Sequence, residues 1–315
     1  MTARAARTPT KPSLTTIVRR ALEGECVLPS GSALVVAVSG GPDSMALLDG
    51  LARVGPGLGL SIVAHGVDHG LRPEAGRELD LAEAFAAKLG IPFDRTCVTV
   101  PRGGNVQARA RERRWEALAT VARRHDAAIA TAHHADDRAE TVLMRLLRGA
   151  GARGLGVLPP RAHAPAPAAT EKPCEVMVVR PLLRARREDI LRHVTLHDIP
   201  FASDPSNVDP RYLRTAVRRD VLPLLAKLDP NVVRHLEAIA DELADARAPT
   251  PVPPWASALP RATQEALVKL ATSRAGAARV WLPGGLVVSV DPRARAKKSA
   301  GARARTRVVP VKPSG

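Results

Sequence analysis

Six consecutive residues, 39–44, have the types and spacing to bind a phosphate group. They read Ser-Gly-Gly-Pro-Asp-Ser, follow an apolar run at 34–38 and precede a helical pattern that begins near Met45. Glycine lets backbone N–H groups approach an anion, hydroxyl groups add donors, and a helix start carries partial positive charge. We therefore predict an anion loop made of Ser39, Gly40, Gly41, Pro42, Asp43 and Ser44. No Lys-Ser or Lys-Thr pair follows, which excludes a Walker-type loop; the alternative is a plain strand-to-helix turn.

A second candidate group lies at 133–140, where the sequence reads His-His-Ala-Asp-Asp-Arg-Ala-Glu and continues as a helical pattern to residue 147. Asp137 and Glu140 are three residues apart, and Asp136 and Glu140 are four apart, so each pair shares a helix face. Neighbouring carboxylates repel one another unless Mg²⁺ or an ammonium group lies between them. We predict a cation site here. The alternatives are an exposed helix start and a metal site with histidine ligands. Against the metal site, no third ligand lies at a sequence spacing typical of such sites.

Arginines on two predicted helices form the third group. Arg111 and Arg114 are three residues apart, as are Arg145 and Arg148 farther along the chain. The guanidinium group binds phosphate in a forked geometry, so both pairs are candidates for phosphate contacts. The alternative for the first pair is a solubilising helix face.

Strands and helices alternate along the first half of the chain, and their order predicts where these groups lie. Strands are expected at 34–38, 60–64, 93–100, 127–132 and 176–179, and helices at 44–53, 73–89, 105–124 and 136–147. This order predicts an α/β fold with a doubly wound parallel sheet, in which ligands bind beyond the carboxyl ends of the strands. The anion loop, residues 65–72 and residues 131–137 all reach that edge, so we expect them to form one site.

Four parts of the chain are expected. These are a basic segment at 1–31, a domain at 32–228 that carries the three candidate groups, a small, mostly helical domain with a hairpin at 229–292, and a basic disordered tail at 293–315. The hairpin is predicted from apolar runs at 278–282 and 286–290, and a mobile Ala/Pro/His-rich loop is predicted at 159–173. The tail either contacts RNA or is only solvated.

Composition also limits the classes of partner. Lys and Arg number 47 against 31 Asp and Glu, a formal net charge of +16 that favours a polyanion. Aromatic residues make up only 2%, which argues against base stacking as the main means of binding a single strand. The three cysteines form no Cys-x-x-Cys pair, so we expect no disulfide framework or zinc site and a cytoplasmic location. No apolar run is long enough to span a membrane.

Taken in order, these segments resemble the tRNA(Ile)-lysidine synthases, a family of ATP pyrophosphatases with an SGGxDS loop. The resemblance extends through Arg180-Pro181-Leu182-Leu183, Asp204-Pro205-Ser206-Asn207 and the arginine-rich stretch at 211–225, and it fades after about residue 228. The chain is similar to a short form of that family. Three residues depart from the family pattern: Gly66 stands at a usual His, Arg138 at a usual Gln and Thr215 at a usual Asn.

The resemblance implies a PP-loop fold of the adenine nucleotide alpha hydrolase type, with ATP and Mg²⁺ as cofactors. It implies that ATP adenylates the C2 oxygen of cytidine 34 in an isoleucine tRNA with anticodon CAU, and that L-lysine then displaces AMP to give lysidine. Asp43, Asp137 and Glu140 would be catalytic, Asp43 and Asp137 would hold Mg²⁺, and Arg111 and Arg114 would bind nucleotide beside the anion loop. The expected substrate or tRNA contacts are His133, Arg145, Arg148, Arg211, Arg214 and Arg218.

The sequence leaves two other functional hypotheses open. A tRNA thiolase of the same fold would need paired cysteines or an iron–sulfur cluster, whereas Cys97 and Cys174 are isolated in the sequence. A nucleotide-sensing module without turnover would not need the full set of carboxylates. The sequence leaves the oligomeric state open, with a homodimer as the alternative to a monomer.

Overall fold

The structure is a computed structural model of the 315-residue chain, and it describes residues 11–70, 74–100, 106–165, 175–202 and 213–245 together with three short strands beyond them. The chain divides into two compact units, Met1–Asp245 and Ala246–Gly315. None of the helices within the described residues is both long and apolar enough to cross a membrane.

The first unit is built around a six-stranded sheet with the order β3-β2-β1-β4-β6-β5. Its strands are β1 (Ala33–Val38), β2 (Ser61–Asp68), β3 (Phe93–Cys97), β4 (Ala127–Ala130), β5 (Arg161–His163) and β6 (Met177–Val179). All neighbouring pairs are parallel except β5 with β6. This pairing confirms the predicted parallel sheet. Apolar runs such as β1 predict it because the strands of a parallel sheet are buried on both faces. The edge strand β5 lies where a loop was predicted, since its three residues carry no apolar pattern.

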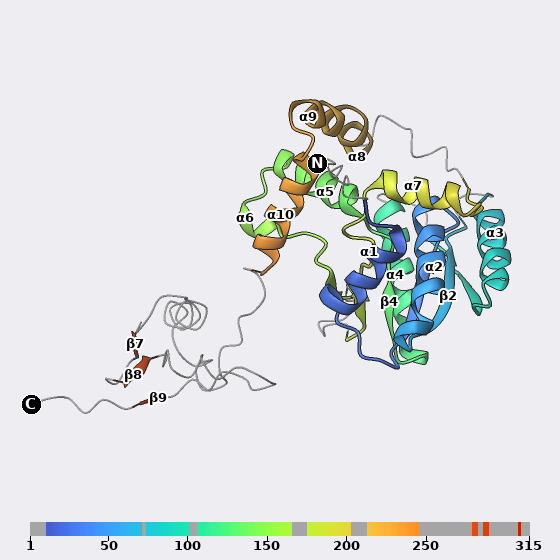
Figure 1. Cartoon of the computed structure of the whole chain (residues 1–315), viewed down its shortest axis with the longest axis horizontal. Helices are drawn as coiled ribbons and strands as arrows, with labels where there is room; N and C mark the ends of the chain where they lie inside the picture. The colour runs from blue at the N-terminus through green and yellow to red at the C-terminus, as the bar shows by residue number, and fades with distance from the viewer. Residues whose placement is uncertain are drawn as a thin grey trace, which may run out of the picture. The chain divides into compact units, whose positions relative to one another are not determined.

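Helices cover both faces of this sheet. On one face α1 (Leu14–Arg20), α2 (Pro42–Val54), α3 (Glu74–Lys88) and α7 (Arg187–Leu196) share one apolar core, and α1 continues as a π-helical turn, Ala21–Glu25. Figure 1 shows α1, α2 and α7 side by side on this face. On the other face α4 (Val106–Arg124) packs Trp115 and Leu118 against β1, β4 and β6.

The chain reverses its winding direction between β1 and β4. It passes outward from β1 through β2 to β3, returns to place β4 on the other side of β1, and continues to β6. Two neighbouring parallel strands therefore send their following segments to opposite faces, which opens a crevice at their carboxyl ends. The anion loop after β1 and the segment after β4 meet at this crevice, as the sequence predicted.

A smaller group of helices follows β4 and packs as its own core. It contains α5 (Ala135–Leu147), α6 (Ala152–Leu155), α8 (Leu213–Ala216), a π-helical turn (Val217–Val221), α9 (Leu222–Leu228) and α10 (Val232–Asp245). The apolar face of α10, with Val233, Leu236 and Ala240, packs against α5 and α6. The first compact unit ends at Asp245, after α10, and the domain boundary at residue 228 stays a prediction.

The second unit contains β7 (Arg279–Leu282) and β8 (Leu286–Ser289), which form the predicted antiparallel hairpin. A third strand, β9 (Val308–Val309), pairs with β8. These two residues correct the prediction of a wholly disordered tail, because a Val-Val pair can extend an open sheet edge. The helix predicted at 263–273 and the basic stretch at 293–307 lie outside the described residues.

A charged cluster joins α5 to α10. Arg138 is fully buried; its Nε donates to the carbonyl of Val157 and its Nη1 to Asp241 Oδ1 at 2.5 Å. Arg184, between β6 and α7, lies 2.7 Å from the other Asp241 oxygen and 3.5 Å from Glu237. The arginine that replaces a usual glutamine is thus compensated by a carboxylate on α10, as a buried cation requires.

The anion loop is held in place by close backbone contacts. Gly40 has φ = +78°, and a Cβ on it would lie 2.5 Å from the carbonyl oxygen of Glu78 in α3. On the other side, the N–H of Ala202 donates to the carbonyl of Gly40 at 2.9 Å. The loop geometry therefore depends on the absence of a side chain at residue 40.

We predict that Gly40→Ala lowers the free energy of unfolding by at least about 1–3 kcal/mol, because it combines a left-handed backbone with a clash against α3. Gly41→Ala is the matched control. At that position φ is −75° and the nearest atom to a new Cβ is Ser39 Oγ at 3.7 Å. Denaturant unfolding of both variants checks this, and equal stabilities would contradict it.

We also predict a pH-dependent contribution from Glu237. Burial raises its pKa to about 7, against the opposing charges of Arg184 and Arg138, with Asp241 adding to the rise. Between about pH 4.5 and 7 the folded protein then binds more protons than the unfolded chain, so stability falls as pH rises. Glu237→Gln cannot ionise, and its melting temperature should exceed that of the parent at pH 8 but not at pH 5.

The control for Glu237 is Glu188→Gln. The pKa of Glu188 is lowered by its hydrogen bond with Lys11, so its removal should give no gain at pH 8. Thermal melts across this pH range make the comparison. If Glu237→Gln lost stability equally at pH 5 and pH 8, the result would show that the Glu237 carboxyl of the parent protein is ionised at both pH values.

Candidate active site

Inside the anion loop, the side chain of Ser44 organises the turn. Its Oγ accepts a hydrogen bond from the N–H of Ser39 at 3.2 Å and donates to the carbonyl of Gly41 at 3.0 Å. Pro42 occupies the first turn of α2, where its missing N–H costs nothing. Ser44 is buried and its hydroxyl is used within the loop, whereas Ser39 is exposed. That both hydroxyl groups donate to a ligand stays a prediction.

Two carboxylates from different helices converge beside this loop. Asp43 lies in the first turn of α2 and Asp137 in the first turn of α5. His134 Nε2 is 3.8 Å from Asp43 Oδ2 and 3.5 Å from Asp137 Oδ2. Burial raises the pKa of Asp43, while His134 opposes the rise. The structure thus brings together two residues that are far apart in sequence, on either side of one imidazole.

His134 lies within the candidate group at 133–140, but the sequence assigned it no role of its own. It is fully buried and caps α5: its Nδ1 accepts from the N–H of Asp137 at 3.4 Å, and its own N–H donates to Asp137 Oδ2 at 3.3 Å. This reciprocal pattern is a capping box. A polar residue three positions before an acid at a helix start is the signal that could have identified it.

The carboxylates fit a magnesium ion better than a protein-only metal cage. Asp43 Oδ1 is buried and has no hydrogen-bond partner within the described residues, which is a state that a bound cation would relieve. Magnesium prefers oxygen ligands and commonly takes one or two carboxylates along with phosphate oxygens and water. Within the same residues there is no cluster of three or more His, Cys, Asp or Glu side chains arranged to bind a metal.

Asp136, the third acid of the predicted group, lies elsewhere. Its oxygens accept hydrogen bonds from the side chain of Arg186 at 2.9 and 3.1 Å and from the N–H of Arg187 at 2.8 Å. These contacts lower the pKa of its carboxyl against the effect of burial. Asp136 therefore anchors the start of α7 and is not free to share a cation with Glu140.

The carboxylate pair, Asp137 and Glu140, is covered by an arginine pair, Arg214 and Arg218. Arg214 donates from Nη2 to Asp137 Oδ1 at 2.5 Å and from Nε to Glu140 Oε2 at 2.8 Å. Arg218 donates to Glu140 at 2.5 and 3.0 Å and lies 3.3 Å from Asp137 Oδ1. The four-residue spacing on α8 and the π-helical turn places both guanidinium groups on one face. They were expected to contact RNA, whereas here they neutralise buried carboxylates; Arg211 lies outside the described residues.

Positive charge gathers on the α4 side of the crevice. His133 Nδ1 lies 2.9 Å from Thr131 Oγ1, and its pKa is lowered to about 3 by burial and by Arg180, Arg111 and Arg114, against the effect of Asp137. The imidazole is therefore neutral at physiological pH. Arg111 and Arg114 of α4 thus act electrostatically on a residue at the end of β4, and their contact with a nucleotide stays a prediction.

Other predicted residues lie farther away. On α5, Arg145 and Arg148 are roughly 12 and 16 Å along the helix axis from Asp137. Arg145 donates to the carbonyl of Gly154, while Arg148 is exposed at the helix end. Neither reaches the anion loop, so only a large substrate could contact them together with it.

The segment after β2 is only partly at the site. His65 is fully buried within β2, and its Nε2 lies 3.0 Å from Thr96 Oγ1. A Cβ on Gly66 would lie 2.7 Å from Leu79 and 3.1 Å from Phe93, so no histidine fits there in this packing. His69 is half-buried, with a pKa lowered by burial and by Arg114.

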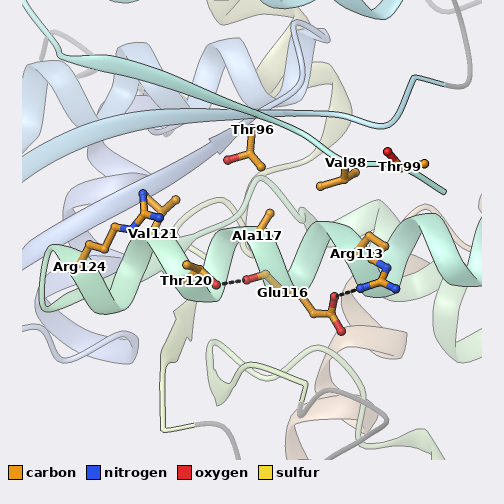
Figure 2. A pocket seen from close by; sticks show the side chains of 9 residues that line it. All are labelled: Thr96, Val98, Thr99, Arg113, Glu116, Ala117, Thr120, Val121 and Arg124. Atoms are coloured by element: carbon orange, nitrogen blue, oxygen red, sulfur yellow. Dashed lines mark hydrogen bonds and ion pairs between the residues drawn. The ribbon is translucent and has the colours of Figure 1, made fainter.

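A separate pocket of about 320 Å³ lies between α4 and the end of β3 (Figure 2). Two of its polar side chains are used internally: Arg113 donates to Glu116 at 2.9 Å, and the Thr120 hydroxyl donates to the Glu116 carbonyl at 2.8 Å. It contains none of the predicted site residues, so it is not the site described above.

The chain matches the PP-loop domain family over residues 14–225. It is 40% identical over 233 residues to a tRNA(Ile)-lysidine synthase of Thermobifida fusca, covering 73% of this chain and 67% of that protein. It is 41% identical over 223 residues to one of Burkholderia mallei, covering 70% of this chain but only 44% of that protein.

Among solved structures, a U34-tRNA thiolase, NcsA from Methanococcus maripaludis with its 4Fe-4S cluster, superposes with a TM-score of 0.61 and 19% identity. The superposition covers 78% of this chain and 89% of the thiolase, and at this identity it supports the fold alone. The extent of the family match and the sequence identity to the curated relatives show the family. The chain belongs to the PP-loop domain family and, within it, to the tRNA(Ile)-lysidine synthases.

Proposed function

We propose that this chain joins L-lysine to C2 of cytidine 34 in an isoleucine tRNA with anticodon CAU, at the expense of ATP, giving lysidine, AMP and pyrophosphate. One observation carries the proposal: Asp43 and Asp137 converge beside the anion loop, and Glu140 lies one helical turn after Asp137 on α5. A phosphate site next to a site for a cation is what activation by ATP followed by attack of an amine requires. The net charge of +16 suits a tRNA partner. The location that we propose is the cytoplasm, because the three cysteines show no disulfide framework.

In the first step, the C2 oxygen of the cytidine attacks the α-phosphorus of ATP, the bond to the β-phosphate breaks and pyrophosphate leaves. The anion loop binds the leaving pyrophosphate through backbone N–H groups at the start of α2. Asp43 and Asp137 would hold Mg²⁺, which offsets phosphate charge when bound. The cytidine must leave its stack to react, as other modified bases do.

In the second step, the ε-amine of lysine attacks C2, the C2–O bond breaks and AMP leaves. Only the neutral amine is nucleophilic, so the ammonium must be bound and then lose a proton. Asp137 and Glu140 are buried and close enough to hold that ammonium together. They are the groups that we assign to receive lysine and to help deprotonate it.

The arginine pair sets a condition on lysine binding. Two carboxylates already face two guanidinium groups, so an added ammonium would leave an excess positive charge in a buried site. At least one arginine must therefore leave when lysine enters. The phosphates of the bound tRNA are the anions that would receive it, which reconciles the RNA contacts expected for Arg214 and Arg218 with their position in this structure.

The cysteines favour lysidine formation over thiolation. Cys26 is buried, and burial raises its pKa to about 11, which disfavours a reactive thiolate. Cys97 is exposed at the end of β3, and Cys174 lies outside the described residues. Among the described residues, no pair of cysteines lies at the crevice, so the likeness to a thiolase is one of fold.

The test is mass analysis of tRNA nucleosides after incubation with ATP, Mg²⁺ and lysine. We expect lysidine only when lysine is supplied. Asp137→Asn and Glu140→Gln should each lower the rate by about 10²-fold or more while tRNA affinity changes little, because these groups act on the amine. Glu188→Gln is the control, since its carboxyl is exposed and pairs with Lys11. A product that needs a sulfur donor instead of lysine would refute the proposal.

A separate measurement addresses the arginine pair. Wild-type protein should bind lysine weakly until tRNA is added, whereas the double variant Arg214→Gln, Arg218→Gln should bind lysine about equally with and without tRNA. Arg219→Gln is the control, because that side chain is exposed on the same turn. Isothermal titration with lysine reports both. Tight lysine binding to the wild type without tRNA would contradict the exchange.

A further inference from the structure

Arg180 is a buried cation whose hydrogen bonds are incomplete. It follows β6 directly, and only 7% of it is exposed. Its Nη1 donates to the carbonyl of Pro159 at 2.6 Å. Its Nε is buried and has no hydrogen-bond partner within the described residues. An orphaned donor on a buried charge is costly, so its retention calls for an explanation.

Two arginines in the described part of the chain make a contrast. The fully buried Arg138 is paired with Asp241, and the half-buried Arg184 is paired with Asp241 and Glu25. Arg180 has no carboxylate at ion-pair distance in the described part of the chain, and the guanidinium charges of Arg111 and Arg138 repel it. Burial, followed by the positive charges of Arg111 and Arg138, lowers its pKa to about 10. What is missing beside Arg180 is an anion.

The position of Arg180 directs it toward the active site. β6 lies beside β4, so residues that follow these two strands share the carboxyl edge of the sheet. Val178 packs into the core under α4, and Arg180, two residues later, faces the same side. The charge of Arg180 acts on His133 together with those of Arg111 and Arg114. These groups gather where β4 and β6 end, and Asp137 of the carboxylate pair also acts on His133 there.

We propose that Arg180, together with Arg111 of α4, forms a second phosphate subsite that is separate from the anion loop. The guanidinium fork matches the oxygens of a phosphate ester, and a bound phosphate would supply both the missing acceptor for Nε and the missing negative charge. The ligand is a phosphate ester, either the α-phosphate of the nucleotide or a phosphodiester of the RNA next to the reacting base. The choice of nucleotide and RNA as the two sources of this phosphate rests on the proposed function, whereas the subsite itself does not.

A binding role makes an unusual prediction about stability. Since Arg180 is buried without an anion, replacing it with an apolar side chain of similar length should leave the melting temperature of the ligand-free protein unchanged or raise it. A purely structural arginine would show the opposite. Arg180→Met is the test variant and Arg180→Lys keeps the charge without the fork. Arg95→Met is the control, because Arg95 pairs with Asp80 and Glu83 at the far edge of the sheet.

The experiment measures the melting temperature of the full chain without ligand and its affinities for AMP, pyrophosphate and a tRNA transcript. For Arg180→Met we expect an unchanged or higher melting temperature, unchanged pyrophosphate affinity and at least tenfold weaker binding of AMP or of tRNA. Arg180→Lys should recover part of the loss, and Arg95→Met should show none. Loss for AMP identifies the nucleotide as the source, and loss for tRNA alone identifies the RNA.

Two results would overturn the subsite. One is unchanged affinity for both AMP and tRNA. The other is a lower melting temperature with similar losses for all three ligands, pyrophosphate included, which would show a structural role. These binding measurements need neither lysine nor turnover. A failure of lysidine formation therefore leaves the subsite standing, and a failure of the subsite leaves the proposed reaction standing.

Discussion

The structure depends on balancing charge where two helices begin at one crevice. Asp43 and Asp137 occupy the first turns of α2 and α5, where the helix dipoles favour negative charge, and His134 lies between them. Glu140 adds a third carboxylate that is almost wholly buried. Three acids in so small a space require cations, and this form of the protein supplies them as Arg214 and Arg218. A substrate ammonium and a metal ion are the natural replacements.

On the positive side of the crevice, the arginines require anions. Burial lowers the pKa of His133, and the charges of Arg180, Arg111 and Arg114 lower it further against that of Asp137. The anion loop begins a helix at the same crevice. A ligand that carries phosphate groups toward this side and an amine toward the carboxylates would satisfy both halves. The division between the two sides follows from the sheet, because alternate residues at the ends of β4 and β6 face different helical layers.

Much of this arrangement could be predicted from the sequence because it is local or repetitive. The apolar runs of β1 and β4 indicate a buried parallel sheet, and the switch point between them follows once the strand order is known. The anion loop is a short string of residues whose types carry their own geometry. Gly40 in particular is explained by a positive φ and by the backbone of α3 above it.

What could not be predicted involves contacts between distant parts of the chain. Arg214 reaches Asp137 across 77 positions, and Arg138 reaches Asp241 across 103, so no local pattern reveals either pair. The orphaned donor of Arg180 is visible only once its surroundings are known. Gly66 departs from the family pattern because Leu79 and Phe93 fill the space of a side chain. The burial of Thr215 is observed, but nothing in the structure explains why it replaces a usual asparagine.

The central claim is that Asp137 and Glu140 bind the side-chain ammonium of lysine in exchange for an arginine. The most direct measurement is an experimental structure of the full chain with lysine, a non-hydrolysable ATP analogue and the tRNA. We predict that the lysine Nζ lies within hydrogen-bond distance of both carboxylates and that at least one guanidinium group has moved onto RNA phosphate. Lysine bound elsewhere, with both arginines still on the carboxylates, would contradict the account.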